Sequence, residues 1–144
     1  RPLFSKVGSK VSKYAIRDNF LNFWFRFVYP YQNAIERNQL HLVREGMEEG
    51  YSQFSGRVLE TYFQSKAMES GKYTEVGNWW DRSGENEVDL VAVNEQNHTG
   101  FIAEVKRNPR KISLPTLAKK VEALPQTTFG KYQFTLGGLS LDDM

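Results

Sequence analysis

Apolar and polar residues alternate most clearly in the middle of the chain. Residues 87–93 and 100–107 are rich in Val, Leu, Ile and Phe, and the polar residues 94–99 separate them. This pattern is typical of a β-hairpin. Residues 72–80 are rich in Tyr, Thr, Val and Trp and predict a strand before the hairpin. Residues 131–136 predict a final strand, which we expect to be followed by a loose acidic tail.

Apolar residues at helical spacing predict one helix on each side of these three central strands. The first runs from about residue 51 to residue 70, and Gly71 ends it. The second begins after Ser113, which is a good N-cap, and ends before Pro125. The predicted order is therefore helix, three strands, helix, strand, in a mixed sheet flanked by helices.

The first fifty residues have a different character. Asp18 is a suitable N-cap for residues 19–28, which are apolar on nearly every side of a helix, so we expect this helix to be largely buried and to end at Pro30. Residues 31–50 are polar and are predicted to be partly helical. Residues 1–17 are basic and predict a short hairpin, either the wing of a winged-helix domain or padding on the main domain.

Charged residues interrupt the central hairpin at three positions. Asp89 lies within an apolar strand, and Glu104 and Lys106 lie two residues apart in the next strand, so they share a face. Asp89 joins that face if it lies opposite Glu104 or Lys106, and leaves it if it lies opposite Val105. Two carboxylates beside one ammonium suit either a Mg²⁺ site or an ordinary cross-strand ion pair.

Asp89 and the run Glu104-Val105-Lys106 together resemble the motif of the PD-(D/E)XK nuclease superfamily. The run YAIRDNFLNFWFRFVYP, at residues 14–30, resembles a linker in bacterial and archaeal DEXX-box ATPases of the AAA type. In those proteins it joins a winged helix to a C-terminal domain of unknown function that is assigned to this superfamily.

This resemblance implies a restriction-endonuclease-like αβββαβ core of the α/β (α+β) class. It also implies three regions: a basic hairpin at 1–17, a helical linker at 18–50 and a nuclease-like domain at 51–144. Gly56 and Glu60 match a Gly-x-x-x-Glu motif on the first helix of the family, and Glu60 would then belong to the active site.

The implied roles are those of a metal-dependent deoxyribonuclease. Asp89, Glu104 and Glu60 would bind Mg²⁺ or Mn²⁺, and Lys106 would position the nucleophile and offset negative charge in the transition state. The ATPase and winged-helix domains would lie upstream in the same chain. ATP is not expected to bind here, because the sequence contains no Gly-x-x-x-x-Gly-Lys-Ser/Thr loop.

The formal net charge is only +2, but the charge is unevenly distributed. Residues 36–95 carry six basic and twelve acidic side chains, whereas residues 102–131 carry seven basic and two acidic ones. A basic segment after an acidic one suits a bound polyanion, and DNA is the expected partner. The candidate phosphate contacts are Arg107, Arg110, Lys111, Lys119 and Lys120, of which we expect the last two to face solvent.

Other features narrow the class of protein. Cysteine is absent and only two histidines occur, which excludes disulfides and makes a histidine-based metal site improbable. No apolar run is long enough for a membrane helix, and a cytoplasmic location is expected. One of Trp79 and Trp80 is expected in the core, and the other is left open as a base-stacking residue.

Two alternatives to a nuclease remain. The first is an inactive nuclease-fold module that binds DNA, and the second is a module that docks on the ATPase or regulates it. Whether the chain forms a homo-oligomer also stays open.

Overall fold

The computed structural model describes residues 3–4 and 16–144 of the chain. The described residues form two compact units. Residues 16–58 belong to a helical unit, and residues 59–144, together with Leu3 and Phe4, belong to a unit built on a β-sheet. Almost all of the basic hairpin expected at residues 1–17 lies outside the described residues.

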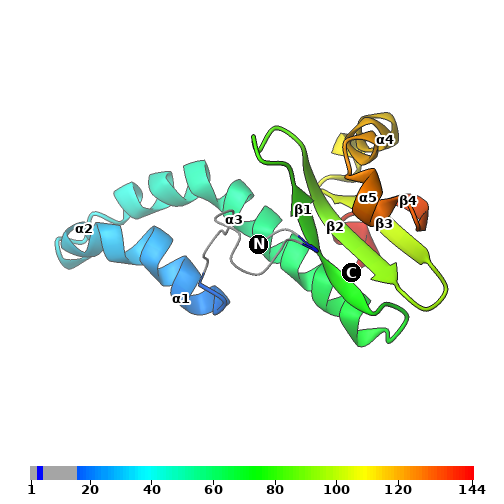
Figure 1. The fold of residues 1–144 in the computed structure, drawn as a ribbon. Coiled ribbons are helices and arrows are strands. Elements are labelled where there is room, and N and C mark those ends of the chain that lie inside the picture. The colour runs from blue at the N-terminus through cyan, green and yellow to red at the C-terminus, as the bar shows by residue number, and fades with distance from the viewer. Residues whose placement is uncertain (1–2, 5–15) are drawn as a thin grey trace. The chain divides into compact units, whose positions relative to one another are not determined.

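The sheet unit contains four strands in the order β1-β2-β3-β4, at Glu75–Trp80, Glu87–Asn94, Thr99–Val105 and Gln133–Leu139. The first three strands are antiparallel neighbours, and β4 runs parallel to β3. A parallel neighbour needs a crossover, and the chain from β3 to β4 supplies it through the helices α4, Leu114–Glu122, and α5, Gln126–Phe129. Figure 1 shows the four strands with these two short helices beside them.

The second half of helix α3, Leu40–Glu69, precedes the sheet in the chain and covers one of its faces. Leu59 and Phe63 of α3 pack with Leu90 and Ala103 on one face of the sheet. The core on the opposite face contains more buried residues and includes residues of α4 and α5. Its buried members are Trp79, Val88, Val91, Val93, Ile102, Leu117, Leu124, Phe129 and Tyr132. The observed order of α3, three strands, α4 and β4 confirms the mixed α+β fold, with a four-stranded sheet between helices.

A bulge lies in β2 at Asp89. Gly77 of β1 pairs with Val91 and Trp79 pairs with Val88, so two residues of β2 face the single residue Asn78. A bulge inserts one residue into the alternation of a strand and often re-aims a side chain beside a functional site. Here it allows Val88 and Val91 to share one core although they are three residues apart.

Helix α3 begins at Leu40, eleven residues before the start that the sequence pattern predicted. The sequence pattern predicts a polar, partly helical stretch around Gly46 and Gly50, but both lie inside this helix. The ring of Tyr31 occupies the position of a side chain at Gly46, and the ring of Phe27 does so at Gly50. These glycines therefore allow close packing rather than breaking the helix. The expected end at Gly71 is confirmed, with a left-handed φ of 67°.

The helical unit begins with α1, Asn19–Phe23, and Asp18 caps it as predicted, because the Asp18 carboxylate accepts a hydrogen bond of 2.8 Å from the Leu21 N–H. A π-helical turn, Trp24–Val28, follows directly. Pro30 does not end the helical path as predicted. It lies in a 3-10 turn, Tyr29–Tyr31, that leads into α2, Gln32–Glu36.

The expectation that this aromatic segment is buried on most sides is wrong. Among its large apolar residues only Phe27 is buried. Phe27 packs edge-on against Phe54 of α3, and Phe23 packs against both. Phe20 and Phe25 keep 68% and 51% of their surface exposed. A single helix neighbour covers only one side of a helix, so the remaining rings stay at the surface.

The chain after residue 136 is also more ordered than predicted. Gly137 and Gly138 belong to β4 rather than to a loose tail. The ring of Phe101 and the side chain of Ile112 lie where a side chain at Gly137 or Gly138 would be, so the glycines allow β4 to pack closely. Ser140, which is buried, then caps the final turn, Leu141–Asp143.

Candidate functional site

The Asp89 carboxylate lies between β2 and β3 at the place where these strands stop pairing. The last pair in their register is Leu90 with Ala103, and Asp89 and Glu104 are the next residues along the two strands. Beyond this point the Asp89 Oδ2 atom accepts a hydrogen bond of 2.9 Å from the Val105 N–H. The side chain thus replaces a strand carbonyl, because a buried N–H requires an acceptor.

The backbone of Asp89 is also held by a side chain. The Gln64 amide on α3 donates a hydrogen bond of 2.9 Å to the Asp89 carbonyl. Gln64 lies one helical turn after the candidate acid Glu60. The hydrogen bond from Gln64 therefore joins this part of α3 to the bulge. Both polar ends of Asp89 are therefore fixed by the neighbouring elements.

Glu104 is the most deeply buried charged residue of the described chain, with 6% of its surface exposed. Its Oε2 atom accepts a hydrogen bond of 2.9 Å from the Ser113 N–H. Ser113 is the N-cap of α4, as predicted, so the carboxylate lies at the positive end of that helix. A buried carboxylate is costly without such partners.

Lys106 connects the two carboxylates. Its Nζ atom lies 3.2 Å from Asp89 Oδ2 and 3.6 Å from Glu104 Oε1. Asp89, Glu104 and Lys106 are thus brought together at one place. Burial lowers the pKa of Lys106, but the charge and hydrogen bond of Asp89 and the charges of Glu104 and Glu60 outweigh it, so the pKa is raised above 10.5. Glu60 therefore acts on the site through its charge.

Lys120 was expected to face solvent beside Lys119, and this is wrong. Lys119 is exposed, but the Lys120 side chain is only 25% exposed and its Nζ atom lies 4.0 Å from Glu104 Oε1. Lys120 follows the buried Leu117 by three residues and precedes the buried Leu124 by four, so it shares their face of α4. That spacing was visible in the sequence and indicates the partly buried face of α4, but it does not by itself place Lys120 beside Glu104.

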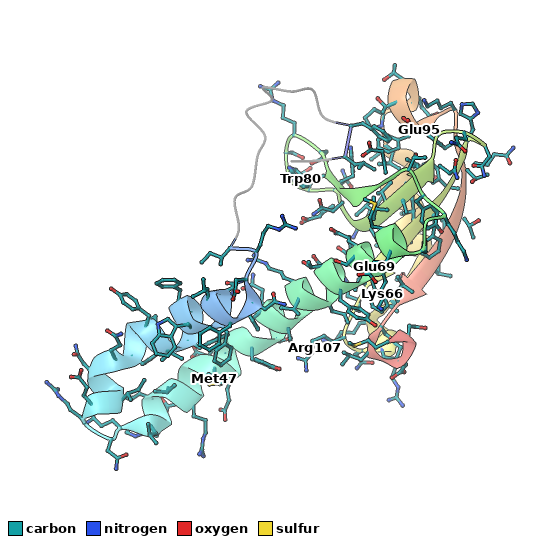
Figure 2. The ribbon with its side chains drawn as sticks, turned by 90° about the horizontal axis from the view of Figure 1, so that it is seen from below. Met47, Lys66, Glu69, Trp80, Glu95 and Arg107 are labelled. Carbon is teal, nitrogen blue, oxygen red and sulfur yellow. The ribbon has the colours of Figure 1, made fainter. Side chains whose placement is uncertain are left out.

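The remaining candidate phosphate contacts lie on exposed parts of the chain between β3 and α4. Arg107 follows β3, and Figure 2 labels its side chain. Arg110 and Lys111 belong to the short turn Pro109–Lys111, which the Asn108 side chain caps. Their exposure leaves them accessible to a polyanion, and their role in DNA binding stays a prediction.

Neither of the two tryptophans before the site is open to a base. Trp79 and Trp80 each retain 6% of their surface exposed, and Trp79 belongs to the larger core. The residue that was left open as a stacking platform is therefore in the interior, which removes base stacking at this position.

Asp89 and Glu104 are the candidate ligands of a divalent ion. In the described part of the chain no three His, Cys, Asp or Glu side chains are grouped as a ready metal site. Asp89 and Glu104 supply two carboxylates on neighbouring strands, and Lys106 lies within ion-pair distance of both. Two carboxylates suit Mg²⁺, which keeps several of its waters. The pair therefore fits the implied metal, with Lys106 between its members.

Comparisons with known proteins place the chain in a family. Residues 24–115 match the DUF234 family, described as archaeal and bacterial proteins of unknown function. The chain is also similar to an uncharacterized protein of Methanocaldococcus jannaschii, with 34% identity over 112 residues. That match covers 73% of this chain and 25% of the relative. The chain thus spans about a quarter of the relative's length. No solved structure matched the chain. Within the described residues no helix is both long and apolar enough to cross a membrane.

Proposed function

The chain belongs to the DUF234 family, and we propose that its sheet unit is a metal-dependent DNA nuclease domain. The observation that carries the proposal is the position of the Lys106 ammonium within 3.2 Å of Asp89 and 3.6 Å of Glu104. Two carboxylates and one ammonium at the place where β2 and β3 stop pairing can support metal-assisted phosphodiester hydrolysis. The αβββαβ order around them supports the same proposal.

Each residue has a distinct part in this reaction. Asp89 and Glu104 would hold Mg²⁺ or Mn²⁺, and a metal ion supplies Lewis acidity and a water of lowered pKa. Lys106 carries a positive charge at neutral pH, since its pKa is raised, and so suits the negative charge that develops on the phosphate oxygens. Glu60 strengthens that charge and would aid a second metal ion or a water molecule.

The substrate and the rest of the protein form part of the proposal. The exposed side chains Arg107, Arg110, Lys111 and Lys119 would neutralise phosphates along DNA. Because the relative is about four times as long as the matched segment, we propose that this unit is the C-terminal domain of a cytoplasmic DEXX-box ATPase. The resemblance of residues 14–30 to the linker of those ATPases supports that arrangement.

Incubation of the purified chain with supercoiled and linear DNA tests the activity. The parent is expected to cut in Mg²⁺ or Mn²⁺ but not in EDTA. Lys106→Met and Glu104→Gln should each lower the cleavage rate about 100-fold or more, the usual loss of a group that stabilises transition-state charge. Lys66→Met is the matched control, because Lys66 is exposed and pairs with Glu69 on α3. Metal-independent cleavage, or equal rates in all variants, would contradict the proposal.

A binding module is the second candidate, and one observation favours it. Lys106 and Lys120 both approach Glu104, so the two ammoniums already compensate the acids without a metal ion. A chain that binds DNA in EDTA and in Mg²⁺ with the same affinity, and never cuts it, would support this second function.

A further inference from the structure

Lys120 occupies a position that the proposed reaction does not yet use. Lys120 follows the buried Leu117 of α4 by three residues, and three-quarters of its side chain is covered. Its ammonium nevertheless lies within 4.0 Å of the buried Glu104 carboxylate. A lysine held in this way is more than a solvated surface charge, because most of its side chain is covered and its ammonium has an acidic partner.

The two lysines of the site are attached unequally. Lys106 has a hydrogen bond of 3.2 Å to Asp89 and a second carboxylate at 3.6 Å. Lys120 has a single carboxylate at 4.0 Å, at the limit of an ion pair. A divalent cation placed between Asp89 and Glu104 repels both ammoniums. The ammonium with the weaker attachment is the one that leaves.

We propose that Lys120 is a positioning residue that exchanges partners. In the metal-free protein it is the counter-cation of Glu104, and in the metal-loaded protein it turns to a backbone phosphate of DNA. The inference rests on the proposed function, since it takes a divalent ion and DNA as the two ligands. Lys119, Arg110 and Lys111 are exposed around α4 and its preceding turn, so the released ammonium joins a surface that is already basic.

The exchange makes the metal and DNA reinforce each other. A lysine that pairs with Glu104 in the absence of metal contributes little to DNA affinity, and it contributes a phosphate contact only after release. Linkage then requires that DNA tightens metal binding by the factor by which metal tightens DNA binding. Lys119 is exposed and has no such competing partner among the residues that the structure describes, so its contribution is independent of metal.

Fluorescence anisotropy with a labelled DNA duplex, in EDTA and in Ca²⁺, tests this inference. Ca²⁺ prefers the same oxygen ligands as Mg²⁺, and a gel checks that the duplex stays intact. Lys119→Gln should lower DNA affinity by the same factor in both conditions. Lys120→Gln should leave the affinity in EDTA within about twofold of the parent and lower it about fivefold in Ca²⁺, the lower end of ordinary coupling factors. Lys120→Arg keeps the charge and should retain most of the coupling.

The outcomes separate the inference from the proposed function. If the parent binds DNA more tightly in Ca²⁺ and Lys120→Gln behaves like Lys119→Gln, only the exchange by Lys120 is overturned. If the parent shows no response to Ca²⁺ or does not bind DNA, both the proposed function and the exchange fail. Thermal melts in EDTA check that each variant folds. If Lys120→Gln is unfolded, Lys120→Met, which keeps most of the apolar stem, takes its place and faces the same two outcomes.

Discussion

The two units depart from the usual distribution of side chains in opposite ways. The sheet unit places charged groups inside, with the Glu104 side chain 8% exposed and that of Asp89 12% exposed. The helical unit leaves apolar rings outside, with Phe20 and Phe25 more than half exposed. Buried polar groups and exposed apolar groups are the informative exceptions in a folded chain. Each costs free energy, and neither is needed to form the fold.

The two units differ in whether these exceptional side chains have partners within their own unit. The buried acids of the sheet unit have partners for their charge in the backbone, in Lys106 and in Lys120, so their arrangement is complete within the unit. The exposed rings of the helical unit pack on one another, as Phe25 does on Tyr29, but one side of each stays open. We therefore expect the first arrangement to hold without a partner from outside the unit, and the second to contribute little to stability.

The largest expected effect breaks this comparison directly. Leu90 is 1% exposed and packs with Leu59 and Phe63, so Leu90→Ala should lower the free energy of unfolding by about 2–5 kcal/mol. Phe25→Ala removes a larger side chain that is half exposed, and should cost about 1 kcal/mol or less. Urea denaturation measures both. A loss at Phe25 as large as that at Leu90 would mean that the exposed rings hold the fold together.

The next effect concerns the acid in the bulge. Asp89→Ala leaves the Val105 N–H without its acceptor in a part-buried position, and should cost about 1–3 kcal/mol. Asp89→Asn keeps an oxygen for this N–H, and Lys106 keeps Glu104, so its metal-free stability should stay within about 1 kcal/mol of the parent.

Thermal melts of both variants in EDTA and in Mg²⁺ sharpen the result. Mg²⁺ should stabilise the parent and stabilise Asp89→Asn less, because a ligand stabilises the protein only as far as it binds. If Asp89→Asn is as destabilised as Asp89→Ala, and Mg²⁺ changes neither variant nor the parent, Asp89 is an ordinary ion-pair partner.

Local rules predicted much of the fold and the central part of the site. The caps at Asp18 and Ser113 and the stop at Gly71 follow from the chemistry of single residues, and all three were predicted correctly. Two-residue alternation placed Glu104 and Lys106 on one face before any pairing was known. These features depend on neighbours in the sequence, which is why the sequence was sufficient.

The features that the sequence did not predict depend on distant contacts. The bulge that aims Asp89 is a property of the β1–β2 pair, and no single residue marks it. Gly50 and Gly138 suggest a break, whereas Phe27 and Ile112 fill the space beside them. Lys120 shares a face with apolar neighbours, but only the buried Glu104 explains why a charge belongs there.

A smaller effect is expected at Gly56, in the middle of α3. A side chain built at Gly56 would meet no atom within 4 Å of those described, and alanine is the better helix former. Gly56→Ala should therefore raise the free energy of unfolding by about 0.5–1 kcal/mol. Gly138→Ala is the control with the opposite sign, since its side chain would overlap Ile112.

Cleavage by the Gly56 variant sharpens the comparison further. If Gly56→Ala is more stable but cuts DNA more slowly than the parent, the glycine serves the reaction rather than the stability of α3. If stability falls, the helix is packed at Gly56 against something outside the described contacts, and the expected sign is wrong.

The smallest expected effect is the alkaline titration of Lys106. Its pKa is raised above 10.5 in the folded chain, so its ion pairs contribute fully below 10.5 and lose their contribution as the pH rises through the folded pKa. The side chain is 35% exposed, and solvent screening keeps this contribution small. The free energy of unfolding should therefore fall less steeply above pH 10.5 in Lys106→Met than in the parent.

Lys119→Met, which changes an exposed lysine of α4, controls for the general effect of alkali. Glu60→Gln removes one of the charges that raise the Lys106 pKa. The free energy of unfolding should therefore begin to fall at a lower pH in this variant than in the parent. Identical alkaline slopes in the parent and Lys106→Met would show that the ammonium between Asp89 and Glu104 does not hold them, and would remove the basis for contrasting the two units.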